Sequence, residues 1–299
     1  MDRSIKTISS ILPVFIILTA CNMPGSGTPP AVLEGTVAPV TEAPQTDAPT
    51  EAALPSPTEA VILPANTTVP ADLSFNIDCS ALDPSKQARC DTFINQTRDI
   101  VYPIFRELTG TSLSQCYDGV YYTITPGETV ANGAGGLATG NIIAYAAQYS
   151  VDLPHKYDTH EILHTFAACN GALDGHIFHS ILGNAVYSRL KVTEAGYFRD
   201  RANAAELNSA LVEMVKTSSG TDLYDQCRGI LGNHMTMGYF DVGEAPMIEI
   251  YKATMNPSPA SAPNPTLTAI WGGSAAQVQV ALEKLDQVKY PLDVPSCGY

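Results

Sequence analysis

The 299-residue chain lacks three features that would each indicate a class of protein. It has no basic stripe, since 16 Lys and Arg stand against 30 Asp and Glu for a formal net charge of −14. Nucleic acid is therefore not expected as a partner. Beyond the N-terminus it lacks an apolar run long enough to span a bilayer. It also lacks a Cys-x-x-Cys pair, which argues against a thiolate zinc site.

The first 21 residues have the pattern of an export signal. Arg3 and Lys6 precede a short apolar run at positions 8–20, which ends in Leu18-Thr19-Ala20-Cys21. This ending resembles the lipobox of bacterial lipoproteins. The resemblance implies a signal peptide over residues 1–21, lipidation of Cys21, and an extracytoplasmic protein that a lipid anchor alone holds on the membrane. An ordinary secretory signal and an uncleaved anchor are the alternatives.

Residues 22–72 have the composition of a tether. Pro, Thr and Ala dominate this stretch, which has no aromatic residue, no Lys and no Arg. Such a segment buries too little apolar surface to offset the entropy of ordering it, so we expect no fold there. Its prolines favour an extended chain. Residues 73–299 are then the folded domain, long enough for a sizeable core.

One short motif within this domain carries chemistry. His160-Glu161-Ile162-Leu163-His164 matches H-E-x-x-H. On a helix, positions i and i+4 share one face, so His160 and His164 would direct two imidazoles at one point, as Zn²⁺ requires. Glu161 would stand beside the metal as a general base. The alternative is an accidental match on an amphipathic helix with two surface histidines.

The periodicity around the motif predicts mainly helices with a few strands. Ile142 to Val151 would be a strand, Asp152 the N-cap of the motif helix, and Asn170-Gly171 its end. Glu128 to Asn141, with four glycines, is predicted to be a flexible loop. Other expected elements are helices over 84–108, 204–216, 222–231, 246–255 and 275–285, a strand over 120–125, and a proline-rich loop over 256–265.

This order of helix, strand, glycine-rich loop, strand and motif helix resembles the first lobe of zincin metallopeptidases. The resemblance implies an α+β, zincin-like fold, with a small sheet and the H-E-x-x-H helix in the first lobe and a mostly helical second lobe. Zn²⁺ would be the cofactor. Ala167 and Asn170 replace the diagnostic Gly and His of metzincins, although Thr236 to Tyr239 is similar to their Met-turn.

A catalytic zinc site needs a third protein ligand. In aspzincins, the deuterolysin-like peptidases, this ligand is an Asp in a G-T-x-D pattern, and Gly171-Ala172-Leu173-Asp174 matches it at the Gly and the Asp. The resemblance thus favours Asp174, with His176 as the first alternative. His179, Glu194 and Glu206 stay open, and Asp174 could instead cap the following helix.

Setting Cys21 aside, the domain has an even number of cysteines, which in an exported chain indicates disulfides. Cys79 and Cys90 are close enough in sequence for a local bridge. Cys169 follows the motif, so its bridge, with Cys227 as a candidate partner, would brace the motif helix. The six cysteines are Cys79, Cys90, Cys116, Cys169, Cys227 and Cys297.

Together these patterns predict a surface-anchored zinc metalloendopeptidase that acts on a peptide or protein. His160, His164 and Asp174 would hold the metal, and Glu161 would take a proton from the attacking water and pass it to the leaving amine. The alternative is a non-catalytic binding or adhesion lipoprotein on the same scaffold, in which Glu161 would be dispensable.

Overall fold

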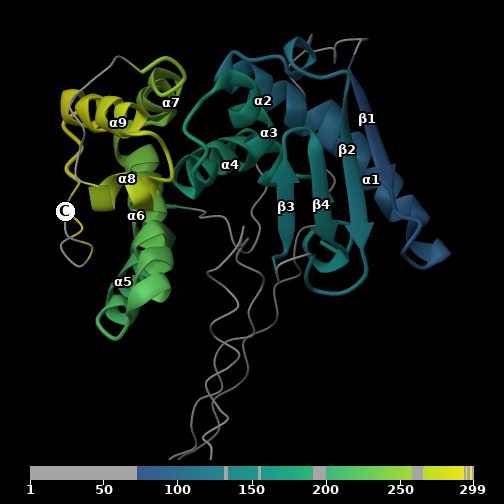
Figure 1. Ribbon diagram of the computed structural model, residues 1–299, viewed down its shortest axis with the longest axis horizontal. Coiled ribbons are helices and arrows are strands. Elements are labelled where there is room, and N and C mark those ends of the chain that lie inside the picture. The colour runs from purple at the N-terminus through teal and green to yellow at the C-terminus, as the bar shows by residue number, and fades with distance from the viewer. Residues whose placement is uncertain are drawn as a thin grey trace, which may run out of the picture.

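The computed structural model describes residues 73–130, 134–153, 156–190, 200–257, 265–292, 294 and 297. The fold is α+β, with one small sheet and many helices (Figure 1). The sheet, α1, α2 and α3 form one side of the molecule, α5 to α9 form the other, and α4 lies between them. The expected signal peptide, the tether, Cys21 and Glu194 lie outside the described residues.

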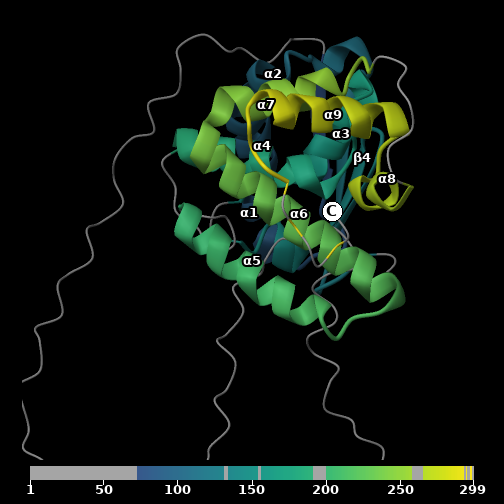
Figure 2. The same ribbon diagram turned by 90° about the vertical axis from the view of Figure 1, so that its left-hand side faces the viewer.

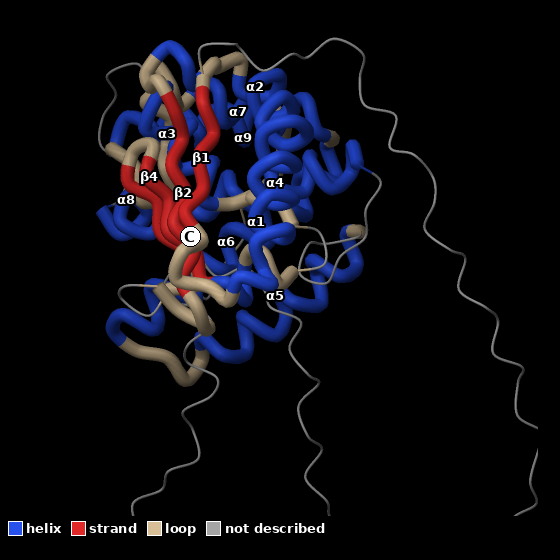
Figure 3. The backbone as a smooth tube through the Cα atoms, turned by 90° about the vertical axis from the view of Figure 1, so that its right-hand side faces the viewer, coloured by secondary structure: helices blue, strands red, loops and turns tan. Residues whose placement is uncertain are grey.

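The sheet has four strands in the order β1-β2-β4-β3 (Figure 1). Figure 3 shows the strands in red from the side of β1. β1 pairs parallel with β2 and β2 pairs parallel with β4, while β3 pairs antiparallel with β4 at the edge. The bounds are β1 Ser74–Asp78, β2 Gly119–Thr125, β3 Gly136–Thr139 and β4 Ile142–Ala146. The strand expected over 120–125 is confirmed, whereas the one expected over 142–151 ends at Ala146 and continues as a 3-10 turn.

The prediction of a loop over 128–141 is wrong for β3. Gly140, with a φ of 59°, and Asn141 form a two-residue connection that turns β3 back onto β4. A Gly-Asn pair between strands is a hairpin signal, since glycine adopts positive φ at little cost. This hairpin places an edge strand beside the motif helix.

One face of the sheet packs on the core. Tyr122 and Tyr145 lie on this face and meet Phe93 of α1 (Gln87–Gln96) edge to face. The opposite face leaves Tyr121 46% and Ile142 59% exposed, although the two side chains are paired across β2 and β4. The core face is the one on which the motif helix also rests.

The helix expected over 84–108 is interrupted. A 3-10 turn (Pro84–Lys86) and α1 lead into a π-helical turn (Thr97–Val101), and α2 (Tyr102–Thr109) follows. Pro103 explains the interruption, because its ring would clash with the carbonyl four residues earlier and it cannot donate to the backbone ladder. Gly110, with a φ of 73°, ends α2.

The motif helix α3 runs from Glu161 to Asn170, later than predicted. Asp152 is not its N-cap, which is a correction to the sequence analysis. The chain between Asp152 and α3 is not helical where it is described, so Asp152 does not stand at the start of the helix. Its carboxylate instead binds Lys86 at 2.6 Å and Arg89 at 2.8 Å. The end of α3 at Gly171, with a φ of 70°, is confirmed.

The rest of the chain is helical. α5 lies along α6, and α6 lies along α4 (Figure 2). α6 is far longer than the helix predicted over 222–231, and it contains Thr236 to Tyr239, so these residues are not a Met-turn. α8 falls at the end of the predicted proline-rich loop. The bounds are α4 His176–Leu190, α5 Arg201–Val215, α6 Gly220–Val242, α7 Glu244–Ala253, α8 Pro265–Trp271 and α9 Ala275–Gln287.

All six cysteines of the domain are paired, in the order in which they occur: Cys79–Cys90, Cys116–Cys169 and Cys227–Cys297. The local bridge is confirmed, and the candidate pair Cys169–Cys227 is wrong. Cys169 lies in the last turn of α3 and is bonded to Cys116 in the segment before β2. Cys227 lies in α6, among the C-terminal helices. Disulfides suggest an extracytoplasmic location. Within the described ranges, no helix combines the length and apolarity that crossing a bilayer requires.

Candidate metal centre

Three histidines meet where α3 and α4 converge. His160 precedes α3, His164 lies in its first turns, and His179 lies in the first turns of α4. One ring nitrogen from each lies within 4.8 Å of the other two. The ring centroids of His164 and His179 are 4.2 Å apart, and those of His160 and His179 are 4.8 Å apart. This cluster could hold a metal ion, because imidazole nitrogens are good ligands for divalent transition metals.

Asp174 borders the histidines rather than lying apart from them. Its Oδ1 atom is 2.6 Å from His164 Nδ1 and 3.6 Å from His179 Nε2. The half-exposed carboxylate approaches from the loop between α3 and α4. A carboxylate on the far nitrogen of a ligating imidazole fixes the orientation of the ring. With Nδ1 of His164 so engaged, a metal would be coordinated through Nε2.

The charges of this cluster are strongly coupled. Burial lowers the pKa of His164, but the hydrogen bond and charge of Asp174 outweigh it, so the net shift is upward. Burial, together with the charge of His164, lowers the pKa of His179 to about 4. Burial raises the pKa of Asp174, yet His164 and His179 more than compensate and hold it well below its usual range. Asp174 is therefore ionised and His179 is neutral near pH 7, as a ligand must be.

Glu161 lies directly beside the cluster. Its side chain is 0% exposed, and its Oε2 atom is 3.9 Å from His164 Nε2. A Cβ atom added to Gly136 of β3 would fall 2.4 Å from Glu161 Oε1. The absence of a side chain on the edge strand thus makes room for the carboxylate.

Asp158 organises the approach to the motif and was not identified from the sequence. Its carboxylate accepts hydrogen bonds from the Tyr122 and Tyr145 hydroxyls and from three successive backbone N–H groups, those of His160, Glu161 and Ile162. Burial raises the pKa of Asp158, against the lowering effect of these donors. The sequence signal for it was weak: a carboxylate two residues before the first histidine.

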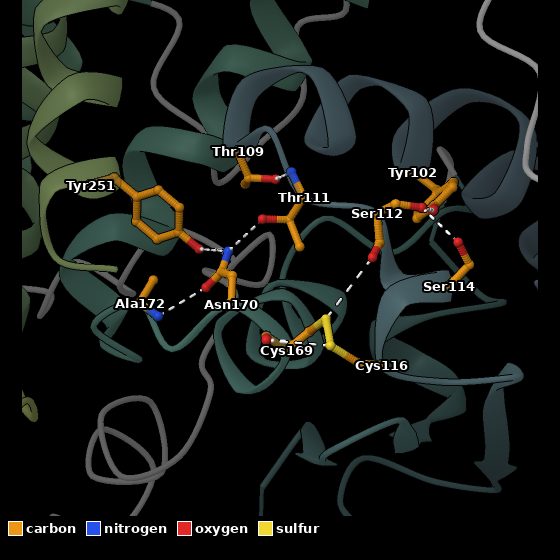
Figure 4. Close-up of a disulfide and its surroundings, with 10 residues drawn as sticks. All are labelled: Tyr102, Thr109, Thr111, Ser112, Ser114, Cys116, Cys169, Asn170, Ala172 and Tyr251. Carbon is orange, nitrogen blue, oxygen red and sulfur yellow. Dashed lines mark hydrogen bonds between the residues drawn. A yellow bond between two sulfur atoms is a disulfide. The ribbon is translucent and has the colours of Figure 1, made fainter. Parts of the chain in front are cut away.

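The far end of α3 is also fixed. The Cys116–Cys169 disulfide ties its last turn to the segment before β2 (Figure 4). Asn170 next to it donates to Thr111 and Tyr251, and accepts from the N–H of Ala172. These contacts hold the loop that presents Asp174.

The remaining candidates from the sequence are placed as follows. His176 opens α4, and its side chain lies outside the described part of the structure. Glu206 is exposed on α5 and is not among the residues that form the histidine cluster. The structure thus brings together His160, His164 and His179, with Glu161 and Asp174 beside them. Comparison of the chain with protein-family models, with curated proteins and with solved structures finds no match.

Proposed function

We propose that this chain is a zinc-dependent metalloendopeptidase with a zincin-like domain. One observation carries the proposal: three imidazoles converge within 4.8 Å, and the carboxylate that follows the first of them lies beside the cluster. Three protein ligands with one open position are the usual composition of a catalytic zinc site, and three histidines are one of the known sets.

The residues fit zinc. His160, His164 and His179 would hold the ion, with Asp174 fixing the His164 ring from its Nδ1 side. This assignment differs from the sequence analysis, which favoured Asp174 as the third ligand and kept His179 as an alternative. Direct coordination by Asp174 is the competing arrangement, because its Oδ1 atom also lies 3.6 Å from His179 Nε2.

When bound, zinc polarises the carbonyl of the scissile bond and lowers the pKa of the attacking water. Glu161 takes the proton from that water and passes it to the leaving amine, first as general base and then as general acid. β3 lies at the edge of the sheet, so an extended peptide can add to it as a further strand. Gly136 of β3 contacts Glu161, so such a peptide would pass close to the base.

The arrangement of elements supports the zincin assignment in part. α1, β2, β4 and the motif helix α3 follow one another in the expected order, whereas β1 and the antiparallel edge strand β3 are additional to it. The start of the motif differs from the expectation, since His160 precedes the first helical residue rather than lying within the helix. Its backbone, with φ −125° and ψ −64°, is not helical.

We place the domain outside the cytoplasm, on a lipid-modified Cys21 and a tether over residues 22–72. The lipobox-like sequence and the three disulfides support this placement. Such an anchor holds a domain at a membrane surface without a spanning helix.

One observation favours a second function, the capture of a ligand or of zinc without turnover. Both carboxylate oxygens of Glu161 are buried, whereas a general base must meet water. In that case Glu161 would shape the site but transfer no proton.

Glu161→Gln in the full chain separates the two functions, because it removes the base and keeps the shape. The experiment measures zinc content by elemental analysis and cleavage of a broad peptide library by mass spectrometry. The peptidase proposal expects one zinc per chain in both proteins and cleavage only by the unmodified one. Zinc without any cleavage by the unmodified chain would leave the binding function.

A further inference from the structure

His160 of the metal cluster and Glu161 beside it both lie at the start of a helix. His160 precedes α3 and Glu161 is its first residue. The first N–H groups of a helix have no partner within the helix, and this turn frays most easily. Something must therefore hold the first turn of α3 in place if His160 and Glu161 are to keep their geometry.

The Asp158 carboxylate holds this turn. Its Oδ1 atom lies 2.9 Å from the backbone nitrogens of both His160 and Glu161, and its Oδ2 atom lies 2.8 Å from that of Ile162. Asp158 is fully buried, so water does not compete for these donors. One side chain thus satisfies three successive N–H groups that include both motif residues at the terminus.

Asp158 is in turn fixed to the sheet and to the π-helical turn. The hydroxyls of Tyr122 on β2 and Tyr145 on β4 donate to it over 2.9 and 2.8 Å. Its own N–H donates to Thr97 Oγ1 over 2.9 Å. Tyr145 additionally accepts from the N–H of Glu161 at 3.3 Å. Asp158 therefore does more than cap α3. It also fixes the position of the first turn relative to β2, β4 and the π-helical turn.

An ordinary cap elsewhere in the chain provides the comparison. Asp200 caps α5 by accepting from the N–H of Asn203 at 3.0 Å, on the exposed surface. Such a cap stabilises its own helix. If Asp158 had only this role, its loss would lower stability but leave the affinity of the folded protein for zinc unchanged.

We propose that Asp158, held by Tyr122 and Tyr145, is the positioning residue that sets His160 and Glu161 at the metal. It is not one of the proposed ligands, and it acts through the backbone of the two motif residues. The proposal rests on the zinc site of the proposed function. It does not rest on peptidase activity.

The experiment uses the full chain with Asp158→Asn, the double variant Tyr122→Phe/Tyr145→Phe, and Asp200→Asn as the matched cap control. Zinc affinity is measured by competition with a chromophoric chelator, and melting temperature by circular dichroism. Loss of a residue that orients ligands costs about 10- to 100-fold in metal affinity. We expect that loss for Asp158→Asn, a smaller one for the double Phe variant, and none for Asp200→Asn.

Two results would overturn the positioning role. One is a folded Asp158→Asn protein with a lowered melting temperature but the zinc affinity of the unmodified chain. The other applies where Asp158→Asn does not fold: unchanged zinc affinity in the double Phe variant, in which the tyrosine hydroxyls no longer hold the Asp158 carboxylate against the sheet. Zinc binding without peptide cleavage by the unmodified chain would refute the peptidase alone. No zinc binding by the unmodified chain would refute both.

Discussion

Glu161 lies against a strand that carries no side chain at the point of contact. Gly136→Ala would place a methyl group 2.4 Å from Glu161 Oε1, so the carboxylate must move. We expect peptide cleavage to fall at least tenfold while zinc content stays at one per chain, because the ligands are untouched. Kinetic assays and elemental analysis measure the two quantities.

Gly119→Ala is the matched control for this change. Its added Cβ would also crowd a side chain of the same sheet, Ser74 Oγ at 2.3 Å, but away from the histidines. We expect it to leave cleavage within about twofold of the unmodified chain. Equal losses in both variants would mean that the sheet as a whole had been disturbed.

The two candidates for the third ligand differ in what their removal costs. His179→Ala should abolish zinc retention, because two imidazoles alone hold zinc weakly. Asp174→Asn should keep one zinc per chain with about 10- to 100-fold lower affinity, since it loosens the His164 ring but removes no ligand. The reverse ranking, measured by chelator competition, would make Asp174 the ligand.

The His164–Asp174 contact also predicts a pH dependence in the zinc-free chain. The folded-state pKa of His164 is raised, so the pair stabilises the fold fully below the unfolded pKa of about 6.5. That contribution is lost as the pH rises through the folded pKa. NMR titration should find the His164 pKa above 6.5, and lower in Asp174→Asn. An unchanged pKa in the variant would contradict the contact.

Among single residues, spacing alone predicted that His160, Glu161 and His164 lie together, because the three belong to one motif. His179 stayed among several candidates, since 14 residues, including a loop, lie between it and His164. Asp158 was missed, because its carboxylate accepts hydrogen bonds from five donors on three separate parts of the chain. No local pattern encodes such a convergence.

At the scale of elements, the disulfide at the end of α3 differs from the other two in exposure. Cys116 is exposed, whereas Cys79, Cys90, Cys227 and Cys297 are 0 to 7% exposed. A thiolate must reach the sulfur that it attacks. Limited treatment with a dithiol should therefore open Cys116–Cys169 first, as measured by alkylation and peptide mapping. Earlier opening of a buried bridge would show that local unfolding governs the order.

Helices with an apolar period were the most predictable elements, and short strands the least. The end of α3 at Gly171 was predictable from the Asn170-Gly171 pair. β1 and β3 have five and four residues, too few for alternation to stand out, and they form because β2 and β4 offer them free edges. The predicted start of α3 was wrong, because the Asp152 carboxylate forms ion pairs with Lys86 and Arg89 and does not cap the helix.

At the scale of the whole molecule, anchoring is the property to test. Lipidation of Cys21 predicts that the full chain expressed in a bacterium fractionates with membranes, because the acyl chains partition into the bilayer. Cys21→Ser should release it, with its disulfides intact. Cell fractionation followed by immunoblotting measures this, and a variant that stays with membranes would indicate an uncleaved N-terminal anchor.

The α+β class and the division into a sheet-bearing part and a helical part were predictable from the order of periodic segments. The path of α4 between the two parts was not predictable from the sequence. This path is what brings His179 to the motif. Topology of this kind is decided by packing between distant segments, which periodicity does not report.

The six cysteines of the folded domain pair strictly in sequence order, first with second, third with fourth and fifth with sixth. A chain that emerges from a translocation channel N-terminus first exposes its cysteines in that same order. A simple oxidase that joins each new cysteine to the one before it would therefore produce the native set. Maturation should need no isomerase to reshuffle wrong pairs, and the first two bridges can close before the last helices have left the channel.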